Sequence, residues 1–177
     1  MTDDDEVPFY VPSDTGDDAP RAIMERLIER EALFTPLRVG EVRIMIVMRT
    51  ASKVRNGRDE LGSMSLPRFQ GGLAALGIWL LAEHFGSYPD YVLTLDNTWW
   101  EGSTPEQREA LVFHELMHCE HATDREGELK FQDDGRPVWA IKGHDIEEFR
   151  EVVKRYGDWS GEISGFVRAA VEGGCTG

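Results

Sequence analysis

Apolar side chains recur along the chain at two spacings, one typical of helices and one typical of strands. Between residues 22 and 33 they fall on one helical face, and opposite charges three to five positions apart fill the other faces. Pro36 is expected to end this helix. Residues 42–48, in contrast, are apolar and rich in β-branched side chains almost without a break. Such a run predicts a strand in the centre of a sheet.

The middle of the chain has the pattern of a hairpin followed by a helix and another strand. Asn56-Gly57 is the strongest turn signal within residues 49–58, and residues 61–66 are expected to form the returning strand. Residues 71–85 have helical spacing, and residues 91–95 have the composition of a strand. The residues of this helix that we expect to pack inward are Leu73, Leu76, Trp79, Leu80 and Ala82.

The most strongly marked helix start lies at residue 104. Thr104 is a suitable N-cap residue, Pro105 suits the first helical position, and Gln107 stands where a capping box requires it. We expect this helix to run to about His121. The polar, Gly- and Asp-rich residues 122–137 then predict a loop or a short hairpin.

The last third of the chain predicts a short apolar segment and further helices. Residues 138–141 are apolar, and residues 144–157 alternate like an amphipathic helix that Gly157 would end. Residues 161–171 are expected to form one more short helix. Taken together, these elements predict an α+β fold with a short mixed β-sheet and flanking helices.

A length of 177 residues predicts one domain, which we place at residues 21–172. Residues 1–20 contain seven acidic side chains, three prolines and no Lys or Arg, and are expected to form a flexible acidic arm. Residues 173–177 are rich in glycine and are expected to fray.

The overall charge limits the classes of partner. A net charge of −14 gives no overall attraction to nucleic acid or to an anionic membrane. One basic segment, which we interpret as a solvated turn rather than a contact for substrate or an acidic partner, contains Arg49, Lys53, Arg55 and Arg58. Two cysteines make no disulfide framework, and neither a signal peptide nor an apolar run of about 20 residues is visible. These features favour a cytoplasmic location.

The strongest functional signal is the sequence His114-Glu115-Leu116-Met117-His118 within the capped helix. Two histidines four residues apart lie on the same face of a helix, so both rings can bind one zinc ion. The carboxylate of Glu115 can reach a water on that metal without replacing a ligand. Cys119 comes directly after this motif, and we interpret it as a small buried residue rather than a thiol switch.

A catalytic zinc needs a third protein ligand and one open position. The sequence offers several candidates downstream of the motif, which are His121, Asp124, His144, Asp145, Glu147 and Glu148. The spacing of a metzincin is absent, because neither the required glycine nor the final histidine is present. The residues alone leave the third ligand open.

The motif, followed about 25 residues later by the segment Gly143-His144-Asp145, resembles the SprT-like zinc metallopeptidases, and still more the small metallopeptidases of bacteriophage genomes. The resemblance covers roughly residues 40–157. It implies a zincin-like domain in which the sheet packs on the motif helix, and it implies that His144 is the third ligand. The acidic charge departs from the DNA-linked SprT-like proteases, so a role in repair of DNA–protein crosslinks is not expected.

These observations lead to the hypothesis of a zinc peptidase that hydrolyses peptides or proteins, in the host cytoplasm if the gene belongs to a phage. His114, His118 and His144 would hold the metal, and Glu115 would act as general base. The candidates for stabilising the oxyanion are Arg155, Tyr156 and Arg125. A strand at residues 91–95 could pair with an extended peptide if it lies at the sheet edge. The alternatives are a catalytically silent protein that binds a host factor and a zinc hydrolase acting on a non-peptide amide.

Overall fold

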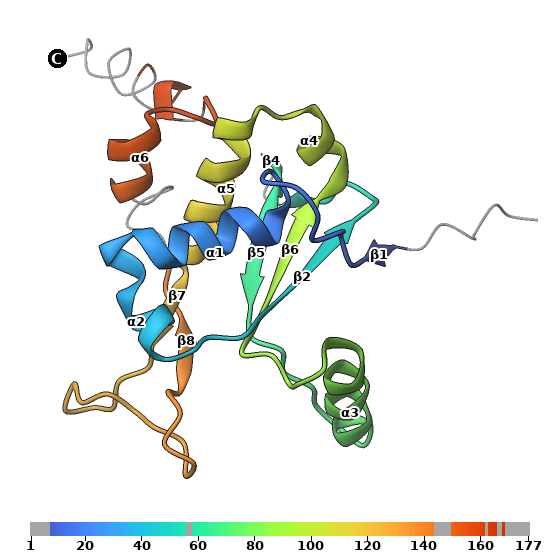
Figure 1. Cartoon of the computed structure of the whole chain (residues 1–177), viewed down its shortest axis with the longest axis vertical. Helices are drawn as coiled ribbons and strands as arrows, with labels where there is room; N and C mark the ends of the chain where they lie inside the picture. Colours follow the sequence, from blue (N-terminus) through green and yellow to red (C-terminus); the bar gives the residue numbers. More distant parts are fainter. Residues whose placement is uncertain (1–7, 56–57, 144–149, 162, 166–167, 169–177) are drawn as a thin grey trace, which may run out of the picture.

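The computed structural model describes residues 8–55, 58–143, 150–161, 163–165 and 168. At its centre lies a four-stranded sheet with the order β1 (Phe9–Tyr10), β2 (Ile44–Arg49), β6 (Tyr91–Asp96) and β5 (Gly62–Ser65) (Figure 1). Strands β2 and β6 are parallel, whereas β1 and β5 are antiparallel to their neighbours. The predicted α+β fold with a mixed sheet and an internal β2 strand is therefore confirmed.

Strand β6 lies between β2 and β5, so it is not the edge strand that the peptide-pairing hypothesis required. The strand at this edge of the sheet is β5, which contacts the motif helix α5 (Pro105–Met117). The apolar composition of residues 91–95 predicts a buried strand, but it does not show whether that strand lies in the centre or at the edge of the sheet.

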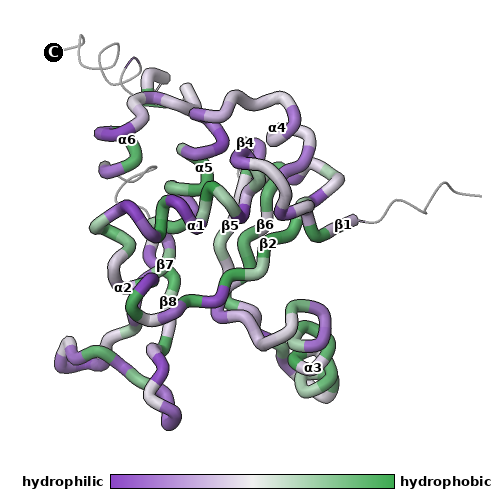
Figure 2. The backbone as a smooth tube through the Cα atoms, in the orientation of Figure 1, coloured by the Kyte–Doolittle hydropathy of each residue, from purple (hydrophilic) through white to green (hydrophobic). Residues whose placement is uncertain are grey.

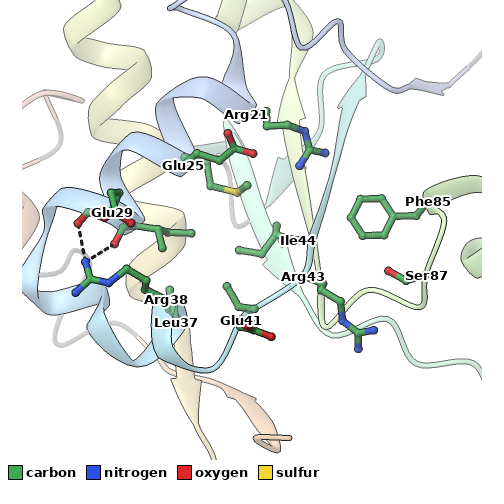
Figure 3. Close-up of a pocket in the computed structure, with 13 residues that line it drawn as sticks. Arg21, Glu25, Glu29, Leu37, Arg38, Glu41, Arg43, Ile44, Phe85 and Ser87 are labelled. Atoms are coloured by element: carbon green, nitrogen blue, oxygen red, sulfur yellow. Dashed lines mark hydrogen bonds between the residues drawn. The ribbon is translucent and has the colours of Figure 1, made fainter.

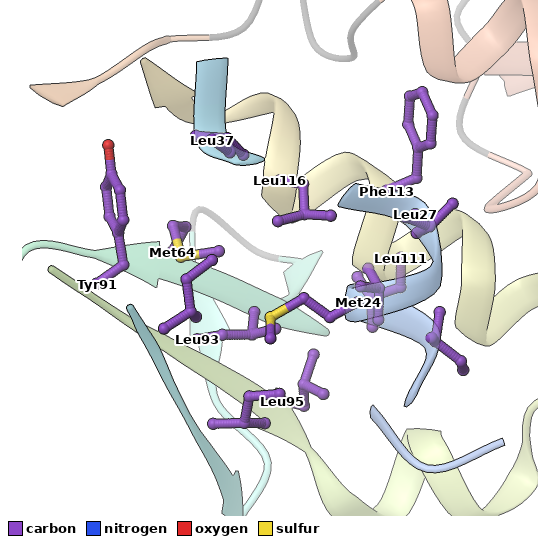
Figure 4. Packing of buried hydrophobic residues seen from close by; sticks show 14 of the residues in the cluster. Met24, Leu27, Leu37, Met64, Tyr91, Leu93, Leu95, Leu111, Phe113 and Leu116 are labelled. Atoms are coloured by element: carbon purple, nitrogen blue, oxygen red, sulfur yellow. The ribbon is translucent and has the colours of Figure 1, made fainter. Parts of the chain in front are cut away.

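The hydrophobic core fills the space between the sheet and two helices, α1 (Pro20–Arg30) and α5 (Figure 4). Alternate side chains of β6 face these helices, and three of them are completely buried, namely Tyr91, Leu93 and Leu95. The opposing side chains labelled on the two helices are Met24, Leu27, Leu111, Phe113 and Leu116. Burial of side chains of this size contributes about 1.5–3 kcal/mol each, and it fixes the motif helix against the sheet.

The segment after α1 differs from the prediction. The helix ends at Arg30, and a turn of 3₁₀ helix (Ala32–Phe34) leads into α2 (Thr35–Val39). Pro36 stands in the first turn of α2 rather than stopping α1. A proline in this position loses no helical hydrogen bond, because the first N–H groups of a helix have no partner within it.

The described part of the predicted acidic arm contacts the rest of the domain. Strand β1 pairs with the end of β2, and the Tyr10 hydroxyl donates to the side chain of Asn97 over 2.6 Å. Asp14 forms an ion pair with Arg21 at the start of α1. Backbone pairing of residues 9–10 and the Tyr10 hydroxyl provide contacts that composition alone did not reveal.

Two hairpins complete the β structure. Strands β3 (Val54–Arg55) and β4 (Arg58–Asp59) pair on either side of residues 56–57, which lie outside the described residues. Helix α5 ends four residues earlier than predicted, because the chain turns directly into β7 (Cys119–His121). Strand β7 pairs with β8 (Trp139–Ile141), the apolar segment seen in the sequence.

The helix predicted at residues 71–85 exists as α3 (Ala74–Phe85), but its expected inward packing is wrong. None of its residues is buried, and Trp79 is 55% exposed. Figure 1 shows the reason: α3 stands apart from the sheet, whose helical face α1 and α5 already cover. Figure 2 shows the hydrophobic character of this helix.

The chain continues after β8 through Gly143 and returns as α6 (Arg150–Tyr156), which packs on α5. Gly157 ends α6 with a φ of +66°, as predicted from its place in the sequence. Most of the short helix expected at residues 161–171 lies outside the described residues. Within the described part of the chain, none of the helices combines the length and hydrophobicity that crossing a membrane requires.

Candidate metal centre

The motif lies on a helix whose start is fixed by its sequence. The Thr104 hydroxyl accepts from the backbone N–H of Gln107 over 3.3 Å, and the Gln107 side chain accepts from the backbone N–H of Thr104 over 2.9 Å. This is the predicted capping box. Burial of Leu111, Val112 and Leu116 then determines which face of α5 is turned away from the core.

His114 and His118 lie side by side at the C-terminal end of this helix. Their ring centroids are 5.2 Å apart, and the ring planes make an angle of 70°. His118 is the C-cap residue and keeps helical backbone angles, so the four-residue spacing still brings both rings to one side. The sequence prediction that these two histidines share a face is confirmed.

The β7–β8 hairpin fixes the orientation of the His118 ring. Nδ1 of His118 lies 2.7 Å from the backbone carbonyl oxygen of Lys142. A carbonyl can only accept, so Nδ1 carries a proton, and in the neutral ring the lone pair is then on Nε2. The backbone N–H of Lys142 also donates to the carbonyl of His118 over 2.8 Å. This pattern, in which the ring N–H remote from the metal donates to a carbonyl, is typical of metal-binding histidines.

Tyr91 joins this hairpin to the central sheet. Its hydroxyl donates to the carbonyl of Ala140 over 2.6 Å and lies 3.3 Å from the carbonyl of Glu120. The side chain is completely buried, and burial raises the pKa of the Tyr91 hydroxyl well above its usual range. Tyr91 therefore stays a neutral donor and holds both strands of the hairpin beside α5.

Glu115 is buried between the motif helix and β5, with only 3% of its surface exposed. Gly62, the first residue of β5, allows this close approach. A methyl group at Gly62 would lie 2.8 Å from Oε1 of Glu115, which is closer than van der Waals contact permits. The backbone of Gly62 and the carboxylate of Glu115 are therefore in direct contact, with no side chain between them.

An indole covers the other histidine. The Trp159 ring lies 6.2 Å from the His114 ring and 6.1 Å from the Trp99 ring, both in edge-to-face arrangements. Trp99 packs partly buried against the core at α4 (Asn97–Gly102), where Asp96 accepts from its backbone N–H. The site thus has an apolar wall that shields His114.

Of the candidates for the third ligand, His144, Asp145, Glu147 and Glu148 lie outside the described residues. Within the described ranges, no three His, Cys, Asp or Glu side chains are grouped closely enough to hold one metal ion. His121 is engaged elsewhere, because its Nε2 lies 2.7 Å from the carbonyl of Lys130 and its ring packs on Phe131. These contacts favour a ligand from the segment after Lys142.

The predicted oxyanion residues have structural partners on another side of α5. The Tyr156 hydroxyl donates to Glu109 over 3.0 Å, and its ring packs on Phe113. Arg155 forms an ion pair with Glu31. Glu109 and Phe113 lie on a different face of the helix from the histidines, given 3.6 residues per turn. These contacts lend no support to the oxyanion role, which stays a prediction for both residues and for Arg125.

Comparison with protein-family models gives one match, and it covers most of the chain. Residues 16–171 match the family described as "putative phage metallopeptidase". The chain belongs to this family. Comparison with curated proteins and with solved structures gives no match. Membership of a metallopeptidase family implies a metal cofactor and a peptide or protein substrate, and it agrees with the resemblance noted from residues 114–118 and 143–145.

Other residues singled out in this phage metallopeptidase sequence have structural roles. Arg49 is buried, and its guanidinium pairs with Glu60 over 3.1 Å and with Asp96 over 3.4 Å. Lys53 also reaches Glu60. Cys119 is only partly buried, but desolvation raises the pKa of its thiol, which therefore stays protonated.

A cavity of about 480 Å³ lies between α1, α2 and β2 (Figure 3). Its basic side chains already have partners: Arg38 donates to the carbonyl of Glu29 over 2.6 Å, and Arg43 pairs with Asp90. The residues that line it come from these elements and from the end of α3, whereas the histidines lie on α5. It is therefore separate from the candidate metal centre.

Sequence reasoning missed three residues that build this metallopeptidase site. Lys142 contacts His118 through backbone atoms, so its residue type gives no indication of this role. Tyr91 was counted only as part of a strand. Gly62 did carry a signal, since a glycine inside a strand often marks a close approach of another group.

Proposed function

We propose that the chain is a zinc-dependent peptidase with a zincin-like domain, in which His114, His118 and His144 hold the metal and Glu115 is the general base. The observation that carries this proposal is the hydrogen bond from Nδ1 of His118 to the Lys142 carbonyl. In the neutral ring this bond selects the tautomer that leaves Nε2 to bind a metal. We also propose that the chain resembles the SprT-like enzymes in its fold and in its metal ligands.

The arrangement of the two rings fits one tetrahedral zinc ion. Two imidazoles that shared one tetrahedral zinc ion, with Zn–N bonds of about 2.0–2.1 Å, would have ring centroids about 5 Å apart. The observed separation is 5.2 Å. The rings therefore support shared coordination.

The course of the chain supports a ligand from the segment that follows Lys142. Lys142 is held at His118 by two hydrogen bonds. His144 follows two residues later in the sequence, and a chain advances at most about 3.6 Å per residue. A histidine at this position is therefore tethered within reach of the site, as are the alternatives Glu147 and Glu148 by a longer stretch of chain.

The chemistry follows from the residues around the two histidines. When bound, zinc supplies a Lewis acid that polarises the scissile carbonyl and makes a water molecule acidic near neutral pH. Glu115 takes a proton from that water and later delivers it to the leaving amine. Its burial against β5 limits the positions open to its carboxylate. The indole of Trp159 shields the same site from bulk water on the His114 side.

The substrate would bind in extended form along β5, the edge strand beside α5. Among the described strands β5 pairs only with β6, so its other edge can accept the backbone of a peptide. This replaces the hypothesis that residues 91–95 bind the peptide.

The test is the metal content of the purified protein beside the His144→Ala variant, measured by elemental analysis. We expect about one zinc per chain in the wild type and a large loss in the variant. Equal zinc in both proteins would move the third ligand to Glu147 or Glu148. Absence of zinc from both after reconstitution would refute the metal site.

Glu115→Gln separates catalysis from binding. We expect this variant to retain zinc and lose hydrolysis of a quenched-fluorescence peptide library, because glutamine cannot accept the proton. A wild type that binds zinc but leaves the library and protein substrates intact would favour the catalytically silent binding protein. Cleavage confined to non-peptide amides would favour the third hypothesis.

A further inference from the structure

Helix α3 carries the largest group of exposed apolar side chains that lie close together in the described chain. Leu76, Trp79 and Leu80 are 47%, 55% and 52% exposed, and their spacing places them on one face. Leu73 at the N-cap extends this face and is 73% exposed. Ile78, 42% exposed, lies on another side of the helix. We call the four residues on the shared face, Leu73, Leu76, Trp79 and Leu80, the α3 surface.

The chain holds this helix in a defined shape although it stands apart from the core. The ring of Phe69 packs on Gly77, where any side chain would come within 2.5 Å of it. The Tyr88 hydroxyl donates to the carbonyl of Pro67, which joins the two connections that lead to and from α3. A helix that is apolar on most sides and fixed in this way is typical of an element buried in an assembly.

The charges around α3 indicate what kind of surface can cover it. Residues 69–107 contain no Lys or Arg, so the helix lacks the basic side chains with which interfacial helices bind anionic lipids. Glu83 is the only acidic side chain between residues 69 and 89. In a chain with a net charge of −14, this is a region that a second copy can approach with little charge repulsion.

We infer that the α3 surface is the interface of a homodimer, formed by antiparallel packing of α3 against α3 of a second copy. A two-fold axis brings the same patch from each copy together, so an apolar face without charged side chains is its own complement. The four side chains and Phe69 expose on the order of 500 Å² per copy. Two copies would therefore bury about 1,000 Å², the lower bound for a specific interface. Trp79 lies within this patch and is of the residue type that most often dominates binding energy.

The experiment is sedimentation equilibrium on the full chain from 1 to 100 μM, comparing the wild type with Leu76→Glu/Leu80→Glu. The substitutions face each other across the axis and replace apolar contact by like charge. A matched control, Val39→Glu/Leu129→Glu, adds the same two charges at side chains that are 75% and 53% exposed outside α3. Circular dichroism and thermal unfolding verify that all three proteins are folded.

We expect the wild type and the control to dimerise with a micromolar dissociation constant, and the α3 variant to be at least about 100-fold weaker. A wild type that is monomeric over the whole range overturns the inference. If that monomer floats with phosphatidylcholine vesicles, the α3 surface binds lipid. If it does not float, the surface binds a different protein. A dimer that persists in the α3 variant also overturns it. Zinc binding and peptidase activity are measured separately, so neither result depends on the metal site.

Discussion

Replacement of Gly62 by alanine tests the geometry of the proposed general base directly. The added methyl group would lie 2.8 Å from Oε1 of Glu115 and 3.2 Å from its Cγ and Cδ. Gly62 does not have a left-handed backbone, so alanine itself is not strained there. The carboxylate must therefore retreat from β5 by about 0.5 Å or more to reach normal van der Waals separation.

The size of this shift sets the expected loss of activity. A misplacement of about 1 Å in an active site can reduce the rate by about 100-fold. We expect Gly62→Ala to lower kcat by about 10- to 100-fold, which corresponds to about 1.4–2.7 kcal/mol in the activation barrier. The metal ligands are untouched, so zinc content should not change. Stability should change little, because alanine restricts the unfolded chain by about 0.4–1 kcal/mol and this gain opposes the crowding.

The assay is peptide hydrolysis under saturating substrate, with zinc content and thermal unfolding measured on the same samples. Gly102→Ala is the matched control, since a methyl group there meets nothing within 4 Å and its backbone is not left-handed. It should behave as the wild type in all three measurements. Full kcat in Gly62→Ala with zinc bound would refute the idea that β5 positions Glu115.

Three further substitutions test the supports of the site. Tyr91→Phe removes the donor to the partly buried carbonyl of Ala140 and should cost about 0.5–1.5 kcal/mol in urea unfolding, with weaker zinc binding in a competition titration; unchanged zinc affinity would refute a role of Tyr91 in positioning the hairpin. Thr104→Ala removes one half of the capping box and should lower stability by about 0.5–2 kcal/mol, seen as a lower Tm, whereas Thr104→Ser should keep it. Arg49→Ala leaves two acidic partners buried and should cost about 3–5 kcal/mol, and a smaller loss in denaturant unfolding would show that water reaches this ion pair.

Much of the local structure could be predicted because the signals are local. The capping box, the four-residue spacing of His114 and His118, and the apolar run of β2 each depend on a few neighbouring residues. Physical rules for caps and periodicity apply to such short stretches without knowledge of the rest of the fold.

Predictions failed where the result depends on the competition for space in the whole fold. The spacing of α3 is that of a core helix, yet the helical face of the sheet is already occupied by α1 and α5. Strand order failed for the same reason, since composition marks β6 as buried but does not reveal that β5 lies outside it. The role of Lys142 could not be predicted at all, because its contacts with His118 use backbone atoms.

The site therefore combines a part that forms with the helix and a part that depends on tertiary packing. His114 and His118 come together whenever α5 is helical, but the His118 tautomer is selected only when the β7–β8 hairpin is docked by its pairing and by Tyr91. The chain then returns as α6, where Tyr156 contacts Glu109 and Phe113 of the same helix. Both flanks of residues 144–149 are thus fixed on α5. A ligand from this segment would couple metal binding to the docking of both flanks. Zinc should then stabilise the folded chain by mass action, with a free energy that rises with the logarithm of its free concentration over its dissociation constant.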